Sequence, residues 1–385
     1  MVEKIFFDLI KQREDEIKSL RKKGRKVIGY LCSRFPVELA YALDLIPIRV
    51  FVTDSSYESL GTVFIWERMC PYAKLITGNF LAEDSFYSQN IDVLSGTVIC
   101  QVVHRMLDVL SAYTKKPTLM LIYPLLRPPE KDQLELFTSE VQWLKKELEK
   151  LSQTHLTEQK LKEAIELYDK VRKELIDVYE SYLEERLNIT YKDFIKLVLL
   201  SQFLDPFEFL NFVKEVKKEA GSSSIKKGDN KVKILISGSI ILPENEVILD
   251  LVEKCGGKIV ADDTCSGLRS FYGIEVKEVS ISAIAKAYLH AIPCGATQCL
   301  DLGKDERLNF LTDIIKKYDI HGVIYQTLRY CDPFSFKVNE TQKFLQKVKS
   351  VAFLPIHMDV SSSEIQRLQT RIEAFIESIS FKLGG

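Results

Sequence analysis

The sequence has no uncharged apolar stretch of about 18 residues, so we expect no membrane-spanning helix. Its first segment, MVEKIFFDLIKQREDEIKSLRKK, is interrupted by charges and lacks the apolar core of a signal peptide. This favours an amphipathic helix in a cytoplasmic protein. The formal net charge is only -1. Such a balance supplies neither a basic field for nucleic acid nor the acidic excess that is typical of disorder.

Common catalytic motifs are missing as well. The patterns GxxxxGK[ST], GxGxxG, GxSxG and HExxH do not occur, so no loop for a nucleotide phosphate is expected in this chain. The sequence contains five histidines. One cysteine–histidine pair, Cys100 and His104, is four residues apart, and we assign His104 no catalytic role because this spacing suits a helix face.

The length of 385 residues is sufficient for two or three domains. Two portions alternate apolar runs with helical patterns, which predicts βαβ units and parallel sheets. The expected strands lie at 27–31, 46–52, 97–100 and 118–123, and at 232–237, 258–261, 322–328 and 351–356. We therefore expect an α/β fold with two Rossmann-like parallel-sheet domains joined by a helical segment.

The helical segment is charged and has one apolar stripe at helical spacing. The stripe consists of Leu161, Ile165, Tyr168, Leu175, Tyr179 and Tyr182. The sequence EAGSSSIKKGDN has the composition of a linker. The expected division is therefore an N-terminal helix and first α/β domain at 1–133, a helical segment at 134–218, a linker at 219–230 and a second α/β domain at 231–385.

Eight cysteines are present, and a disulfide framework is not expected without a secretion signal. Six of them follow an expected strand or lie at an expected turn next to a proline. They are Cys32, Cys70, Cys100, Cys265, Cys294 and Cys331. Ligands of open parallel sheets bind beyond the carboxyl ends of the strands, where helix N-termini favour thiolate. We therefore expect these six to meet in one cleft, although each could also pack as a small apolar side chain.

The other two cysteines are less informative. Cys255 lies on an expected helix before a Gly-Gly pair. It precedes the expected strand 258–261 and so lies at the end opposite to the ligand-binding end, and we interpret it as a packing residue. Cys299 follows Cys294 by five residues and could replace one of the six. No CxxC pair occurs, so singly scattered thiols favour an iron–sulfur cluster over structural zinc.

Three segments carry a resemblance to a known family: GYLCSRFPVELAYALDLIPIRV, DDTCSGLRSF and HGVIYQTLRYCDP. Together, and in this order, they resemble the 2-hydroxyacyl-CoA dehydratase/benzoyl-CoA reductase family over nearly the whole chain. One departure is Asp44–Leu45, which stands where the family has a glycine. The resemblance implies two flavodoxin-like domains, a helical part and an iron–sulfur cofactor.

Two branches of that family differ in their cysteines. Dehydratase subunits hold one [4Fe–4S] cluster with three cysteines, which match Cys70, Cys100 and Cys331. Double-cubane proteins hold an [8Fe–9S] cluster with six. The additional cysteines here, Cys32, Cys265 and Cys294, bring the number to six and favour the double-cubane branch. We expect Arg269, Arg329 and the backbone N–H groups near Gly267 and Gly295 to surround the cluster.

By resemblance, the first hypothesis is an anaerobic, homodimeric, low-potential iron–sulfur oxidoreductase that acts on a small-molecule substrate. A separate ATP-hydrolysing [4Fe–4S] activator would reduce it, in agreement with the missing nucleotide loop. The second hypothesis is a [4Fe–4S] subunit of a 2-hydroxyacyl-CoA dehydratase, which is a lyase. The third is a non-catalytic electron carrier.

Overall fold

The computed structural model describes residues 2–221, 231–243, 246–348, 351–358 and 365–384. Residues 222–230 of the expected linker lie outside this part, and residues 219–221 are the end of a helix. No described helix combines the length and apolar character that crossing a bilayer would require.

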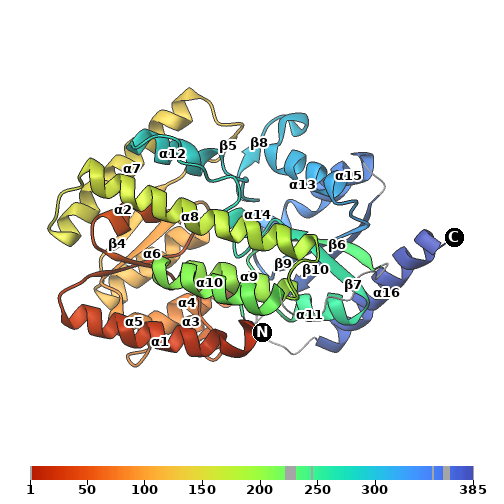
Figure 1. The fold of residues 1–385 in the computed structure, drawn as a ribbon, viewed down its shortest axis with the longest axis horizontal. Coiled ribbons are helices and arrows are strands. Elements are labelled where there is room, and N and C mark those ends of the chain that lie inside the picture. Colours follow the sequence, from red (N-terminus) through yellow and green to blue (C-terminus); the bar gives the residue numbers. More distant parts are fainter. Residues whose placement is uncertain (1, 222–230, 244–245, 349–350, 359–364, 385) are drawn as a thin grey trace.

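Two four-stranded parallel sheets form the framework, and both have the same strand order (Figure 1). The first sheet has the order β2-β1-β3-β4 and consists of β1 (Val27–Tyr30), β2 (Ile46–Arg49), β3 (Val93–Val98) and β4 (Thr118–Ile122). The second has the order β7-β6-β9-β10 and consists of β6 (Val232–Gly238), β7 (Gly257–Asp262), β9 (Gly322–Leu328) and β10 (Ala352–Met358). This repeated order confirms the expected pair of flavodoxin-like sheets.

Helices connect the strands, as parallel pairing requires. Those of the first portion are α1 (Val2–Lys22), α2 (Val37–Ala42), α3 (Tyr57–Phe64), α4 (Pro71–Leu81), α5 (Phe86–Asn90) and α6 (Gln101–Thr114). The helical segment contains α7 (Lys131–Ser152), α8 (Glu158–Leu183), α9 (Tyr191–Ser201) and α10 (Pro206–Gly221). The second portion contains α11 (Val247–Lys254), α12 (Ile281–His290), α13 (Glu306–Lys317), α14 (Asp332–Ser335), α15 (Val338–Val348) and α16 (Ile365–Gly384).

Most of the expected strands begin within one residue of their observed starts, but the third begins earlier than expected. It starts at Val93, because the small and polar residues Ser95, Gly96 and Thr97 interrupt the apolar run without ending the strand. A further two-stranded sheet was not expected. It pairs β5 (Leu126–Arg127) with β8 (Gln298–Cys299) and so joins the two portions of the chain.

Helix α8 lies across both sheet domains (Figure 1). Its apolar stripe is buried, as expected. In the first half of α8, the ring of Tyr168 packs edge-on against Tyr41 of α2, with 5.7 Å between centroids. Near its end, the hydroxyl of Tyr179 donates to the carbonyl oxygen of Val260 on β7, at 2.8 Å. The helical segment therefore holds the two sheets together.

Helix α12 follows the second sheet's β7 in sequence but packs on α7, beside the first sheet. The hydroxyl of Tyr123, just after β4, donates to the carbonyl oxygen of Tyr288 at 3.3 Å. The chain after α12 then returns toward the second sheet through β8. This crossing places the 291–299 loop between the two domains.

Candidate functional site

The cysteines after strands lie where open parallel sheets bind ligands. In the order 2-1-3-4, the connections from the first and third strands leave in opposite directions, and a crevice opens between those strands. Cys32 follows β1 and Cys100 follows β3, on the two sides of that crevice in the first sheet. Cys331 follows β9 at the corresponding place in the second sheet.

Gly238 ends the neighbouring strand β6 at this second crevice. Its φ is +124°, and a Cβ there would lie 1.8 Å from the carbonyl oxygen of Gln326. Only glycine fits a position with both properties. The close approach of β6 to β9 therefore depends on this residue.

Three of the cysteines immediately precede helices: Cys70 before α4, Cys100 before α6 and Cys331 before α14. Pro71 at the first position of α4 fixes a φ that suits a helix start. Tyr330 adopts a left-handed backbone with φ 59°, which turns the chain sharply between β9 and Cys331. These three thiols therefore stand at helix starts.

Cys70, Cys100 and Cys331, named here the Cys70 group, come together from three separate loops. The thiols of Cys70 and Cys331 interact directly, and this hydrogen-bonding interaction lowers the pKa of Cys70 and raises the pKa of Cys331. Burial raises the pKa of Cys100 to about 12, and its interaction with Cys70 acts in the same direction. The two sheet domains therefore both contribute to this group.

Cys32, Cys265 and Cys294, named here the Cys32 group, form a second set. Burial raises the pKa of Cys32 to about 11, and its proximity to Cys294 and Cys265 acts in the same direction. Cys294 also interacts with Cys100, so the two groups adjoin. All six thiols that the sequence singles out are thus connected by interactions.

Cys255 and Cys299 have other contacts. Cys255 follows α11, and its charged neighbours include Glu373 and Glu377 of α16. The thiol of Cys299 donates to the backbone oxygen of Asp301 at 3.0 Å. All eight cysteines are free thiols.

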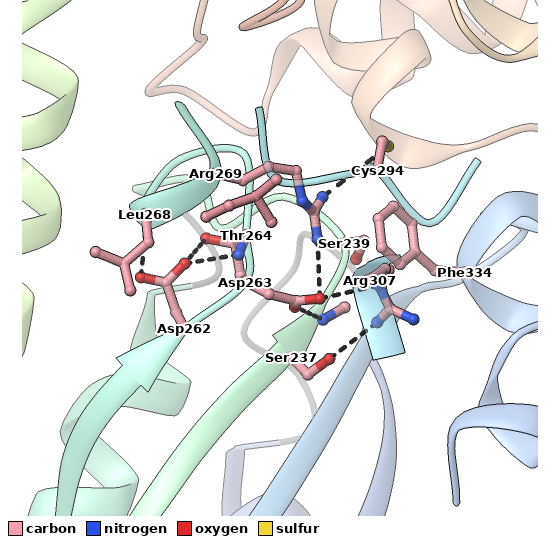
Figure 2. Close-up of polar contacts among 12 residues, drawn as sticks. Ser237, Ser239, Asp262, Asp263, Thr264, Leu268, Arg269, Cys294, Arg307 and Phe334 are labelled. Atoms are coloured by element: carbon pink, nitrogen blue, oxygen red, sulfur yellow. Dashed lines mark hydrogen bonds and ion pairs between the residues drawn. The ribbon is translucent and has the colours of Figure 1, made fainter. Parts of the chain in front are cut away.

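A buried carboxylate organises the loop regions next to the Cys32 group (Figure 2). Asp263, which follows β7, accepts from the Nε of Arg307 at 2.9 Å and lies 3.2 Å from the Nη2 of Arg269. Arg269 in turn directs its Nη1 toward the sulfur of Cys294, at 4.0 Å. Arg269 therefore lies beside one of the cysteines that the sequence singles out.

Two other residues that were expected to surround the cluster, Arg329 and Gly267, have different surroundings. The side chain of Arg329 is exposed, and its backbone N–H donates to Met358 within the second sheet. The N–H of Gly267 donates to the carbonyl oxygen of Thr264, and a Cβ at Gly267 would collide with the carboxylate of Asp262. Arg329 and Gly267 thus have local structural contacts of their own.

Gly295 has a packing role that the sequence does not reveal. A Cβ at this position would lie 2.5 Å from the ring of Phe334. That ring lies over the guanidinium groups of Arg269 and Arg307, at 5.2 and 5.9 Å from its centroid. The absence of a side chain at Gly295 therefore lets the aromatic ring cover both cations.

Three buried arginines near the cysteines were missed by sequence reasoning. Arg34 lies in the loop after β1, two residues after Cys32, and Arg49 is the last residue of β2. A charged residue at or just after an expected buried strand could have pointed to the site, and sequence reasoning overlooked it. Arg307 lies in the first turn of α13, and nothing in its local sequence distinguishes it from a surface residue.

Comparison with known proteins identifies the family of this chain. Residues 32–379 match the family described as 2-hydroxyglutaryl-CoA dehydratase, D-component. The chain belongs to this family. Its relatives include the (R)-phenyllactyl-CoA dehydratase beta subunit of Clostridium sporogenes, 21% identical over 97% of both chains. A subunit of the benzoyl-CoA reductase of Thauera aromatica is 23% identical over 92% of this chain and 91% of that one.

Another dehydratase subunit is similar over nearly its whole length. It is the (R)-2-hydroxyglutaryl-CoA dehydratase subunit beta of Acidaminococcus fermentans, 22% identical over 93% of this chain and 94% of that one. These relatives are thus dehydratase and reductase subunits of multi-component enzymes. The family resemblance read from the three sequence segments is confirmed.

The donor set of this family member fits a cluster better than a single ion. Among the described residues, no three His, Cys, Asp or Glu side chains are grouped closely enough to hold one metal ion. In an iron–sulfur cluster, by contrast, each cysteine ligates a different iron, so the sulfurs stand further apart. Six free thiols on loops from both domains supply sulfur donors for several irons rather than for one ion.

Proposed function

We propose that this protein is a low-potential reductase component that carries a double-cubane [8Fe–9S] cluster. It would work as a cytoplasmic homodimer and receive electrons from a separate ATP-hydrolysing iron–sulfur activator. The proposed ligands are Cys32, Cys70, Cys100, Cys265, Cys294 and Cys331. When bound, such a cluster would supply single low-potential electrons to a small reducible molecule.

The grouping of the thiols is the observation that supports this proposal. A single [4Fe–4S] cluster takes at most four cysteines, one for each iron. In two cubanes that share a bridging sulfide, one iron of each is bound by the bridge, which leaves three irons each for cysteine. The Cys70 group and the Cys32 group provide two sets of three, and Cys100 and Cys294 interact across them.

The protein's own side chains would exclude water from this region, and their burial keeps the thiols protonated. Burial raises the pKa values of Cys32 to about 11 and of Cys100 to about 12, so both thiols keep their protons at neutral pH until metal displaces them. Tyr72 lies near Cys32, Cys70 and Cys265, which are members of both groups. Its ring would therefore help to exclude water from both.

Anaerobic purification followed by iron and sulfide analysis tests the proposal. We expect about eight irons per chain, whereas a dehydratase subunit with one cluster would bind about four. Cys32→Ala and Cys265→Ala should each lower the iron content, while the matched controls Cys255→Ala and Cys299→Ala should retain it. Full iron retention in both Cys32→Ala and Cys265→Ala would instead support the dehydratase subunit.

Activity with a partner tests the second part of the proposal. With a family activator, ATP and a small reducible substrate, the loaded protein should catalyse substrate reduction that depends on ATP. No reduction of any substrate, in a protein that nevertheless binds about eight irons, would favour a non-catalytic electron carrier.

A further inference from the structure

Four arginines with almost no solvent exposure lie at the Cys32 group. The exposed fractions are 1% for Arg34, Arg49 and Arg269 and 3% for Arg307. Arginine is rarely buried to this extent without a partner, because removing a charge from water is costly. Their number and position therefore call for a compensating negative charge.

Two of these cations contact the cysteines directly. The Nη1 of Arg49, at the end of β2, donates to the backbone oxygen of Cys265 and, at 2.6 Å, to Oε1 of Gln202. The Nη1 of Arg269 lies 4.0 Å from the sulfur of Cys294. Arg49 comes from the first sheet domain and Arg269 from the second, so both domains direct a cation to the same group.

The other two arginines act on thiols of the same group. The backbone N–H and the guanidinium of Arg34 both favour the thiolate form of Cys32. The guanidinium of Arg307 interacts with Cys294, beyond its ion pair with Asp263. Every member of the Cys32 group therefore has an arginine beside it.

Carboxylates do not balance these charges. Asp263 faces both Arg269 and Arg307. Within the described ranges, Arg34 and Arg49 have no carboxylate at ion-pair distance, and the Nη1 of Arg34 and the Nη2 of Arg49 have no hydrogen-bond partner. Buried donors without partners indicate an anionic occupant on this side of the site.

The Cys70 group has a different environment. The cation among the main influences on the pKa of Cys70 is Lys74, one turn into α4. Its Nζ lies 2.6 Å from the carboxylate of Glu58, which cancels its charge. The field at the Cys70 group is therefore less positive than the field at the Cys32 group.

We infer that the two halves of the site have unequal reduction potentials, with the half held by the Cys32 group accepting an added electron first. This inference rests on the proposed function. The electron comes from an external low-potential iron–sulfur donor, which loses one electron as this protein gains one, and no bond forms or breaks. Buried positive charge favours the more negative, reduced form, and net charge is one of the factors that set cluster potentials.

An anaerobic redox titration followed by electron paramagnetic resonance tests the inference. The variants are Arg49→Gln, Arg34→Gln, Arg49→Lys and, as a control with the same change in charge at the other group, Lys74→Gln. Iron content is measured first for each. We expect the first midpoint potential to become more negative in Arg49→Gln and Arg34→Gln than in Lys74→Gln, and Arg49→Lys to remain near the wild type.

Arg34→Gln is an independent test if Arg49→Gln does not load with iron. An equal or larger shift in Lys74→Gln, or no shift in a fully loaded Arg34→Gln protein, would overturn the inference. The proposed function fails differently, because a wild-type protein with about four irons would contradict it before any titration.

Discussion

The guanidinium of Arg172 on α8 lies 2.8 Å from the carboxylate of Glu38 on α2, in the interior of the protein. Tyr288 of α12 donates to the other carboxylate oxygen, also at 2.8 Å. These three side chains join the helical segment, the first sheet domain and the crossing helix. Glu38 lies six residues after Cys32, so this ion pair supports the loop that carries the first cysteine.

Arg172→Met should therefore destabilise the protein strongly. The substitution leaves the buried carboxylate of Glu38 without its cation, which typically costs about 3–5 kcal/mol. Urea denaturation followed by circular dichroism measures the change. In the control, Lys162→Met removes an exposed partner of Glu166 at 4.0 Å, and we expect less than about 0.5 kcal/mol. Equal losses in the two variants would contradict the role given to the buried pair.

The edge of the second sheet provides another test. Strand β7 is an edge strand, and the hydroxyl of Tyr182 on α8 donates to the carbonyl oxygen of Ile259 at 2.6 Å. Tyr182→Phe leaves this buried acceptor without its donor, so we expect a loss of about 1–3 kcal/mol in the free energy of unfolding. Tyr113→Phe is the control, because the side chain of Tyr113 is 62% exposed. A similar loss in both variants would be evidence against the edge contact.

Much of the architecture could be predicted because it depends on local patterns. Runs such as 322–328 are mostly apolar and bounded by turn residues, and they formed strands where expected. The stripe on α8 also follows directly from residue spacing. The early start of β3 could not be predicted in this way, because Ser95 and Thr97 are polar yet buried in the observed sheet.

The candidate site was predictable only in part. Placement after a strand identified Cys32, Cys100 and Cys331, because that relation is local in sequence. The positions of Arg307 and Phe334 depend on how α13 and α14 approach β7, which is a tertiary relation without a sequence signal. The short β5–β8 sheet has the same cause, because it pairs segments that are far apart in the chain.

Gly295→Ala should disturb the covering of the arginines. Its Cβ would meet the ring of Phe334 at 2.5 Å, so the ring must move from Arg269 and Arg307. Overpacking of this kind costs about 1–3 kcal/mol, and we expect reduced iron binding as well. Chemical denaturation and iron analysis provide the two measurements.

Gly221→Ala is the matched control for this substitution. At Gly221, the nearest atom to an added Cβ is a methyl of Leu187 at 3.9 Å, and alanine favours a helix over glycine. The control should keep or gain stability and bind the wild-type amount of iron. Unchanged iron binding in Gly295→Ala would show that the ring is not required over the two guanidinium groups.

Asp263→Asn tests whether the stability of the protein depends on iron loading of the site. Asp263 is the carboxylate at both Arg269 and Arg307, and its other oxygen accepts from the N–H of Gly238 at 2.9 Å. Removing its charge leaves two buried cations without this counter-charge, and losses of about 3–5 kcal/mol are typical for a broken buried pair. We expect a large decrease in the apparent melting temperature of the iron-free protein.

In the iron-loaded protein the decrease should be smaller, because the proposed anionic cluster near Arg269 would replace part of the missing negative charge. Anaerobic thermal scans of both forms, with and without the substitution, give the comparison. Asp301→Asn is the control, since Asp301 is exposed and lies 3.6 Å from the exposed Lys304, and it should change neither form. An equal decrease in the loaded and iron-free Asp263→Asn proteins would mean that the buried arginines do not sense the charge of the bound cluster.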